Sequence, residues 1–188
     1  MRPYAFAARW LHADLGGAGL GLTVIEIGLI TRLQRVAVRG PIPAAANALS
    51  TFGEHSAGWL LIAGAGFLVD SRRRSTWASL AVAAFAAHAC AVVIKRIVRR
   101  QRPLDDSIQV LDSTPSRLSF PSAHTASSTA VAVTLAPVIG WGPAGVLPVL
   151  MGTGRVLLGV HYPTDVVAGA AAGLLVGRIA RRTVGIGR

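Results

Sequence analysis

The chain has 188 residues and a net charge of +11, and 52% of its residues are hydrophobic against 14% charged. This length predicts one domain spanning residues 1–188, and a mean hydropathy of +0.53 argues against an ordinary soluble protein. The arginines cluster between apolar runs, which is typical of membrane-flanking charge and not of a nucleic-acid-binding surface. We therefore expect a membrane protein with no nucleic-acid partner.

The apolar runs predict an all-α fold, a six-transmembrane-helix bundle preceded by a short interfacial helix in residues 1–14. Gly40 to Pro43 is expected to form a loop. Thr51 and Glu54 have the spacing of a capping box ahead of the second span. The expected spans are 15–30, 56–69, 77–98, 122–139, 145–160 and 163–179.

Glycines at 169, 173 and 177 recur every four residues in the last span, which predicts a face for close helix packing. Because successive spans cross the membrane in opposite directions, the third and fifth should end on the face where the fourth and sixth begin. Three groups of polar residues, all within 95–165, are expected to meet on that face.

The first group is Lys95 and Arg102. If the helix persists to Arg102, the two cations lie about 10 Å apart along its axis and face one way, before Pro103 ends the helix. A lysine point charge and a planar arginine fork are suited to clamping a phosphoryl group. For this group alone, a membrane-flanking basic run is the alternative.

The second group comprises Pro121, Ser122, Ala123 and His124. Pro followed by Ser predicts a capped helix start, whose free N–H groups form an anion site. His124 in the first turn can give a proton to a leaving oxygen. Alone, it is also compatible with a polar interfacial histidine.

The third group is Arg155, His161 and Asp165. If a helix begins near Pro163, the i, i+4 spacing lets Asp165 reach His161. A carboxylate on one imidazole nitrogen leaves the other free to attack. The alternative for Asp165 is an acid that stabilises the first turn of a helix.

These groups resemble the signature of the type 2 phosphatidic acid phosphatase superfamily, namely Lys-x6-Arg-Pro, Pro-Ser-Gly-His and Ser-Arg-x5-His-x3-Asp. The chain has KRIVRRQRP at 95–103, PSAH at 121–124 and GRVLLGVHYPTD at 154–165. It departs at Ala123, where the family has Gly, and at Gly154, where it has Ser. Ala123 keeps its backbone N–H, whereas Gly154 lacks a hydroxyl that would bind phosphate.

The resemblance implies a metal-independent lipid phosphatase of the plasma membrane that needs no cofactor. His161 would form a phosphohistidine, oriented by Asp165, while His124 would protonate the leaving group and then activate water. The phosphate is expected to be bound by Lys95, Arg102, Ser122, Ala123 and Arg155.

Residues 114–124 and 157–163 are most similar to small actinobacterial members of this family, which dephosphorylate decaprenylphosphoryl-5-phosphoribose for cell-wall arabinan synthesis. We therefore expect a polyprenyl-linked phosphomonoester that enters from the bilayer. The enzyme alternatives are an undecaprenyl- or decaprenyl-diphosphate phosphatase and a phosphatidylglycerophosphate phosphatase. A lipid carrier and a haem-binding helix bundle are the non-enzyme alternatives.

Other polar residues support weaker expectations. Glu54 and His55 lie on the catalytic face and are candidate head-group contacts, Glu26 is expected to pair with an arginine of the bundle, and His88 is expected to pack between helices. A slight excess of arginine on the opposite face predicts an extracytoplasmic active site, and the oligomeric state is open. Three loop acids are expected to be solvated and not to bind metal: Asp105, Asp106 and Asp112.

Overall fold

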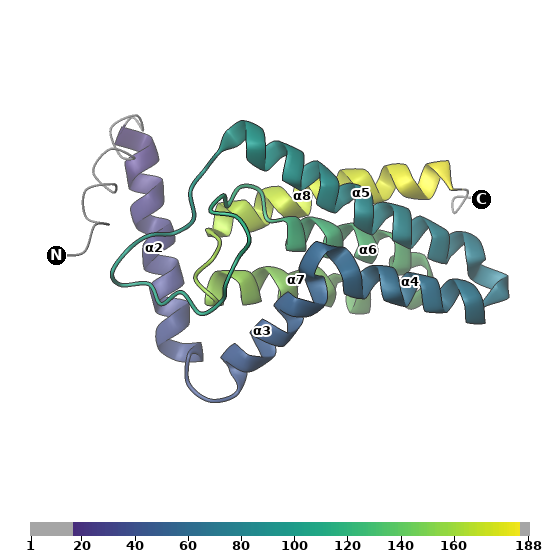
Figure 1. Cartoon of the computed structure of the whole chain (residues 1–188), viewed down its shortest axis with the longest axis horizontal. Helices are drawn as coiled ribbons and strands as arrows, with labels where there is room; N and C mark the ends of the chain where they lie inside the picture. The colour runs from purple at the N-terminus through teal and green to yellow at the C-terminus, as the bar shows by residue number, and fades with distance from the viewer. Residues whose placement is uncertain (1–16, 185–188) are drawn as a thin grey trace.

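The computed structural model describes residues 17–184, and every regular element in that range is helical (Figure 1). The all-α class is therefore confirmed, and the expected interfacial segment at 1–14 lies outside the described residues. The α-helices are α2 (Gly17–Ala37), α3 (Ile42–Gly53), α4 (Ala57–Val69), α5 (Arg74–Val98), α6 (Ala123–Ile139), α7 (Trp141–Leu157) and α8 (Pro163–Thr183). Two short 3-10 helices, η1 (Glu54–Ser56) and η2 (Ser71–Arg73), precede α4 and α5.

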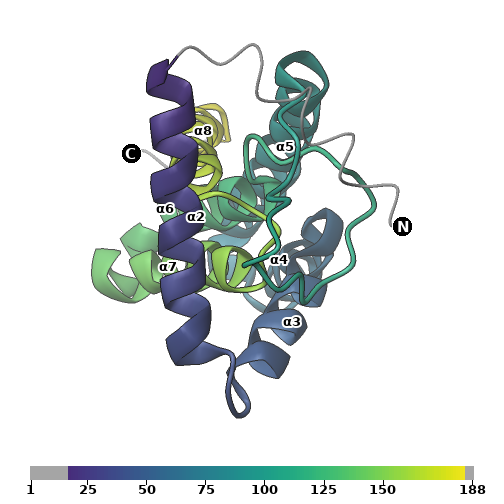
Figure 2. The ribbon, with the colours of Figure 1, turned by 90° about the vertical axis from the view of Figure 1, so that its left-hand side faces the viewer.

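Helices α4 to α8 run side by side along the long axis of the molecule, and α6 contacts α5, α7 and α8 (Figures 1 and 2). Helix α6 is buried along almost its whole length. Its side chains are mainly Ala, Val, Ser and Thr, and the hydroxyls bond within the helix: Ser128 donates to the His124 carbonyl at 2.7 Å and Thr129 to that of Thr125 at 2.8 Å. A helix rich in hydroxyls can therefore occupy the centre of the bundle without unpaired polar groups.

The predicted glycine face of the last helix is confirmed. A methyl group built on Gly169 would lie 2.4 Å from the Ser122 carbonyl oxygen, and one on Gly173 would lie 2.2 Å from that of Ala126. At Gly177 the nearest atom would be the Val133 Cβ at 2.9 Å. Helix α8 thus packs against the backbone of α6, an approach that a side chain at these positions would block.

The bundle has one end at which α5 and α7 terminate and α6 and α8 begin, as the alternation of the spans predicted. We call it the site end. The loop 99–122 joins α5 to α6 there, and the loop 158–162 joins α7 to α8. The two loops contact each other, since the Leu111 N–H donates to the Leu158 carbonyl at 3.0 Å.

The expected count of six spans is not confirmed. Among residues 17–184, two helical stretches are long and apolar enough to cross a membrane, Ser71–Val98 and Pro163–Thr183, and Ala123–Ile139 is a shorter apolar helix. Helix α2, which contains most of the expected first span, does not run along the bundle but crosses its site end (Figure 2).

Polar side chains explain this orientation of α2. Gln34 donates to the carbonyls of Gln109 at 2.7 Å and Leu157 at 2.8 Å, and accepts from the Gln109 N–H at 3.0 Å. Two turns earlier on the same face, Glu26 is also buried. Both side chains require partners, and the loops at the site end supply them.

Helix α3 was not predicted. It begins at Ile42, inside the stretch expected to be a loop, and Pro43 is tolerated because it lies in the first turn. The capping box was also wrong: Thr51 lies inside α3 and its hydroxyl donates to the Asn47 carbonyl at 3.1 Å. Helix α7 starts at Trp141, four residues earlier than expected.

The packing of α8 on α6 can be tested by substituting Gly173 with Ala. The added methyl would overlap the Ala126 carbonyl oxygen, so we expect a loss of about 1–3 kcal/mol in the free energy of unfolding. The Tm of the purified protein in detergent measures this loss. Gly64→Ala is the matched control, because nothing lies within 4 Å of its added methyl; equal Tm values for the two variants would contradict the packing.

Candidate active site

A cavity of about 580 Å³ lies at the site end. The expected site residues that line it are Lys95, Arg102, Ala123, His124, Arg155 and His161, together with Glu54 and His55. Asp165 and Ser122 do not line the cavity and are fully buried behind it. Residues that lie far apart in the sequence are thus brought to one place, as the motif spacing predicted.

His161 lies between an acid and a cation. Its Nδ1 is 3.4 Å from Asp165 Oδ2 and its Nε2 is 3.3 Å from Arg102 Nη1. A guanidinium can only donate, so Nε2 must carry a lone pair and Nδ1 the hydrogen. Burial lowers the pKa of His161 well below its usual value, and nearby cations, first Arg102, lower it further. The ring is therefore neutral at neutral pH, with Nε2 as the free base.

His124 lies in the first turn of α6, and its Nε2 is 3.0 Å from the backbone carbonyl of Ser50. A carbonyl oxygen only accepts hydrogen bonds, so Nε2 carries a hydrogen and Nδ1 is the nitrogen left for proton transfer. Ser50 belongs to α3, a helix that the sequence did not predict, so this contact was missed.

Backbone carbonyls hold two of the cations. Lys95 Nζ donates to the carbonyl of Ser119 at 3.0 Å. Arg102 donates through Nε to the carbonyl of Ser116 at 2.8 Å and through Nη1 to that of Val160 at 2.5 Å. Burial lowers the pKa of Arg102 to about 10, so it remains a cation at neutral pH.

The two cations do not share one helix, contrary to the expectation from their spacing. Helix α5 ends at Val98, and Arg99 adopts a left-handed backbone with φ of 55°. Arg102 lies on the loop that follows, whose first residues pair with its last residues in an isolated bridge between Gln101 and Leu118. This fold of the loop returns Arg102 to the cavity.

Arg155 is almost completely buried and contacts an acid that the sequence did not assign to the site. Its Nη1 donates to Asp112 Oδ2 at 2.6 Å and to the Ser50 hydroxyl. Asp112 is therefore not a solvated loop acid, whereas Asp105 and Asp106 are exposed as expected. Among the described residues the Arg155 Nε is a buried donor without a partner.

The predicted helix start at Ser122 is confirmed. Its hydroxyl accepts from the Thr125 N–H at 3.4 Å and from the Thr125 hydroxyl at 3.0 Å. Its own N–H donates to the backbone carbonyl of Asp165 at 2.9 Å. The Ser122 side chain is thus engaged in capping α6, and Ala123 is the residue of this pair that lines the cavity.

Residues of η1 and α5 also line the cavity. His55 and Ser56 adopt left-handed backbone conformations, with φ of 48° and 62°. His55 Nδ1 lies 3.6 Å from Glu54 Oε1, and the His55 ring centroid is 5.8 Å from that of His88. His88, expected to pack between helices, therefore also lines the cavity.

Glu26 has the arginine partner that was expected, and it is Arg100. Glu26 Oε2 lies 2.6 Å from Arg100 Nη2, and Arg100 Nη1 lies 2.9 Å from Asp165 Oδ1. Sequence reasoning treated Arg100 as part of a basic run and missed its contact with Asp165. An acid within an apolar run was the one available signal, and it did not specify which of many arginines would be the partner.

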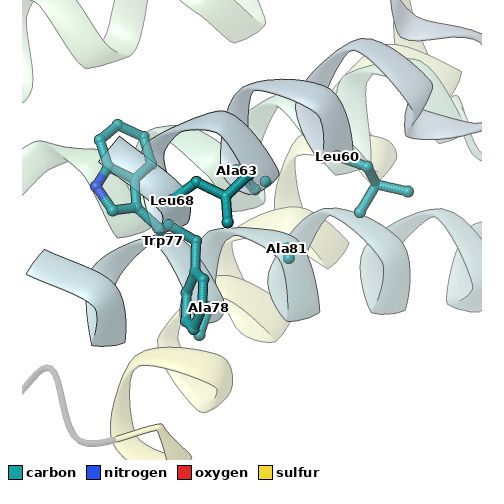
Figure 3. A pocket seen from close by; sticks show the side chains of 8 residues that line it. Leu60, Ala63, Leu68, Trp77, Ala78 and Ala81 are labelled. Carbon is teal, nitrogen blue, oxygen red and sulfur yellow. The ribbon is translucent and has the colours of Figure 1, made fainter. Parts of the chain in front are cut away.

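A second cavity, of about 370 Å³, lies between α4 and α5 (Figure 3). Its lining includes Leu60, Ala63, Leu68, Trp77 and Ala81. None of the described residues that line it is an acid, a base or a hydroxyl-bearing residue.

Known proteins resemble this chain in sequence and fold. The sequence profile of the PAP2 superfamily matches residues 76–186. The decaprenylphosphoryl-5-phosphoribose phosphatase of Mycolicibacterium smegmatis is 51% identical over 75% of this chain and 78% of its own length. The protein of that name from Mycobacterium tuberculosis is 47% identical over 87% of this chain and 92% of its own length.

Two crystal structures share the fold. Aquifex aeolicus LpxE has a TM-score of 0.65 at 23% identity, covering 82% of this chain and 93% of its own. The transmembrane PAP2-type phosphatidylglycerolphosphate phosphatase from Bacillus subtilis has a TM-score of 0.64 at 24% identity, covering 88% and 94%. Together with the two apolar helices, this likeness supports association with a membrane.

The departure at Gly154 can be tested by restoring the serine of the family signature. A Cβ there would lie 3.7 Å from the Ala46 Cβ, an ordinary contact, so Gly154→Ser should fold. The new hydroxyl next to Arg155 should tighten inhibition by inorganic phosphate about 10-fold. Gly154→Ala is the matched control, because it adds the Cβ without the hydroxyl. If the two variants have the same inhibition constant for phosphate, residue 154 does not contact the phosphate.

Proposed function

We infer that this chain, which belongs to the PAP2 superfamily, is a phosphatase whose substrate is decaprenylphosphoryl-5-phosphoribose. The class of enzyme, a phosphatase acting on a lipid phosphate, follows from the family and from the curated relatives. The substrate is the finer proposal, and one observation carries it: relatives at 47–51% identity over most of the chain have that name. We propose residues 1–188 as a single catalytic domain.

His161 is the proposed nucleophile. Its Nε2 lone pair attacks the phosphorus, and the N–P bond forms as the bond from phosphorus to the ribose 5-oxygen breaks. The imidazole becomes positively charged as it forms phosphohistidine, and Asp165, 3.4 Å from Nδ1, stabilises that charge. The neutral state of His161 supports this role, because a protonated imidazole has no lone pair for attack.

His124 is the proposed acid and base. In its imidazolium form it gives the Nδ1 proton to the departing ribose oxygen, and the neutral ring then accepts a proton at Nδ1 from a water molecule whose oxygen attacks the phosphohistidine. The N–P bond breaks, inorganic phosphate leaves, and His161 is neutral again. The sum of the two steps is lipid phosphate plus water giving lipid alcohol plus phosphate, with the proton returned to His124.

Cations are the proposed binding groups for the phosphate oxygens, and no metal or cofactor is required. Lys95, Arg102 and Arg155 line the same cavity as His161, where they can neutralise the charge that grows on the oxygens. The buried Arg155 Nε is a donor directed to no other group of the described residues, which suits an anion. The Ala123 backbone N–H in the first turn of α6 is a further donor.

The head group is proposed to lie against Glu54 and His55. These two residues line the cavity, as do the apolar side chains Ala89, Val92 and Val93 of α5. A ribose with hydroxyl groups suits the polar part of this lining, and an isoprenoid tail suits the apolar part. The lipid would therefore enter from the bilayer along α5.

The proposed location is the plasma membrane, which the chain crosses several times. Helices α4 to α8 lie along one common axis, so we propose that these five cross the bilayer and that α2 lies along the interface at the site end. Exposed apolar side chains on one flank of α2, Leu22, Ile25, Leu29 and Val36, support interfacial contact.

Phosphate release from a lipid panel tests the substrate. The panel is farnesylphosphoryl-5-phosphoribose (the short-chain form of the proposed substrate), farnesyl diphosphate, phosphatidate and phosphatidylglycerophosphate. We expect kcat/KM to be highest for the phosphoribose lipid, and about 10-fold higher or more than for the others, because only it presents both a 5-phosphate and ribose hydroxyls. Faster hydrolysis of the diphosphate or of the glycerophospholipids would replace this substrate with one of theirs.

The nucleophile can be identified by trapping the phosphoenzyme. Wild-type protein quenched in alkali after brief reaction with ³²P-labelled substrate should retain a label that is stable in base and lost in acid, as a phosphoramidate is. His161→Ala should retain no label and release no phosphate above background. His124→Ala should accumulate label relative to its turnover, since it lacks the base for the second step. Persistent turnover in His161→Ala would exclude this mechanism.

A further inference from the structure

Glu26 is a buried acid that the family match does not explain, since it precedes the matched residues 76–186. It lies on α2, outside the bundle, and is only 2% exposed. Both of its oxygens are occupied. Oε2 lies 2.6 Å from Arg100 Nη2, while Oε1 accepts from the backbone N–H of Thr164 at 2.9 Å and from its hydroxyl at 2.6 Å. Because a buried carboxylate is costly without partners, these contacts hold Arg100 and Thr164 in place beside Glu26.

Arg100 lies between this acid and the acid of the nucleophile. Its Nη1 donates to Asp165 Oδ1 at 2.9 Å and to the Thr164 hydroxyl at 2.6 Å. Its guanidinium also lies over the Tyr162 ring, 3.9 Å from the centroid. The Arg100 side chain is 25% exposed, whereas Asp165 is completely buried. Arg100 is therefore fixed on both sides by carboxylates and below by an aromatic ring.

The two oxygens of Asp165 have separate partners. Oδ1 is taken by Arg100, whereas Oδ2 accepts from the Tyr162 N–H at 2.9 Å and lies 3.4 Å from His161 Nδ1. If Arg100 did not hold Oδ1, the carboxylate would lose its charged partner and Oδ2 would be held less firmly beside the imidazole. The charges of these four residues therefore alternate in space. Glu26 is negative, Arg100 is positive and Asp165 is negative, and His161 becomes positive when it attacks.

We propose that Glu26 and Arg100 are positioning residues for the nucleophile. Glu26 fixes Arg100, Arg100 holds Asp165 Oδ1, and Asp165 Oδ2 thereby faces His161 Nδ1. Glu26 also binds the N–H of Thr164 in the first turn of α8, which sets the backbone that carries Asp165. Helix α2 thus acts on the reaction from outside the bundle. The inference rests on the proposed role of His161 as the nucleophile.

The test compares Glu26→Gln and Arg100→Met, which keep side-chain size and remove the charge, with the double variant. The assay is phosphate release from farnesylphosphoryl-5-phosphoribose. We expect each single variant to lower kcat about 10–100-fold, as loss of an outer partner of a catalytic group does, while KM changes less than about 2-fold because neither residue lines the cavity. The double variant should lose less than the product of the single losses, since both act through Asp165.

The pH profile separates positioning from a merely structural role. Removing the positive charge of Arg100 favours protonated His161, so the acid limb of kcat/KM should move to higher pH. Removing the negative charge of Glu26 should move it to lower pH, by less because Glu26 is farther away. The other charged or titratable groups that face His161 are unchanged in both variants: Lys95, Arg102, His124, Arg155 and Asp165.

Two further variants complete the design. Asp70→Asn is the matched control, an acid-to-amide change in the Asp70–Arg73 contact of 3.6 Å at the opposite end of the bundle, and should leave kcat unchanged. Arg100→Lys keeps the charge without the fork, and should give an intermediate kcat with the acid limb of the wild type; it also serves if Arg100→Met does not fold.

Variants that lose thermal stability but keep the wild-type kcat and pH profile would overturn the inference, as would independent, multiplicative losses in the double variant. The proposed function fails separately, if His161→Ala retains activity. An inactive His161→Ala together with normal Glu26 and Arg100 variants would leave the mechanism in place and remove only the positioning role.

Discussion

The structure depends on the need of buried cations for partners. Lys95, Arg102 and Arg155 lie together at one end of an apolar bundle, where an unpaired charge would be far more costly than in water. Lys95 and Arg102 are solvated by backbone carbonyls of the loops 99–122 and 158–162, and Arg155 pairs with an acid of the first loop. The loops therefore fold back over the end of the bundle, and the cavity lies where they meet the helices.

Close packing of α8 on α6 sets the relative positions of the two helix starts at this end. The glycine face of α8 contacts the backbone of α6, and the Ser122 N–H bonds the Asp165 carbonyl at 2.9 Å, so the starts of the two helices are joined. His124 lies in the first turn of α6, and His161 lies two residues before the start of α8. The two histidines are thus carried by the starts of two closely packed helices, which suits the proposed two-step phosphoryl transfer between positioned groups.

Helices α2 and α3 precede the part of the chain that matches the family, yet they contact several of the site groups. Ser50 touches both His124 and Arg155, Gln34 holds the loop at Gln109, and Glu26 holds Arg100. The matched region carries the groups proposed for chemistry, while these two helices contact several of those groups.

The sequence by itself determined the helices α4, α5, α6 and α8, the glycine face and the meeting of three polar groups at one end. These features follow from local patterns: apolar runs, the Ser122 cap, Pro163 at a helix start and the alternation of successive helices. Only the tertiary structure decided that α2 crosses the bundle end and that the cations have Asp112 and carbonyls as partners. It also placed Arg100 between two acids.

These outcomes depend on contacts between residues as far apart as Glu26 and Thr164, separated by 138 positions, and several arginines competed for each acid. A pattern within one segment carries no information about which competitor lies within reach, because the packing of all the segments determines that distance.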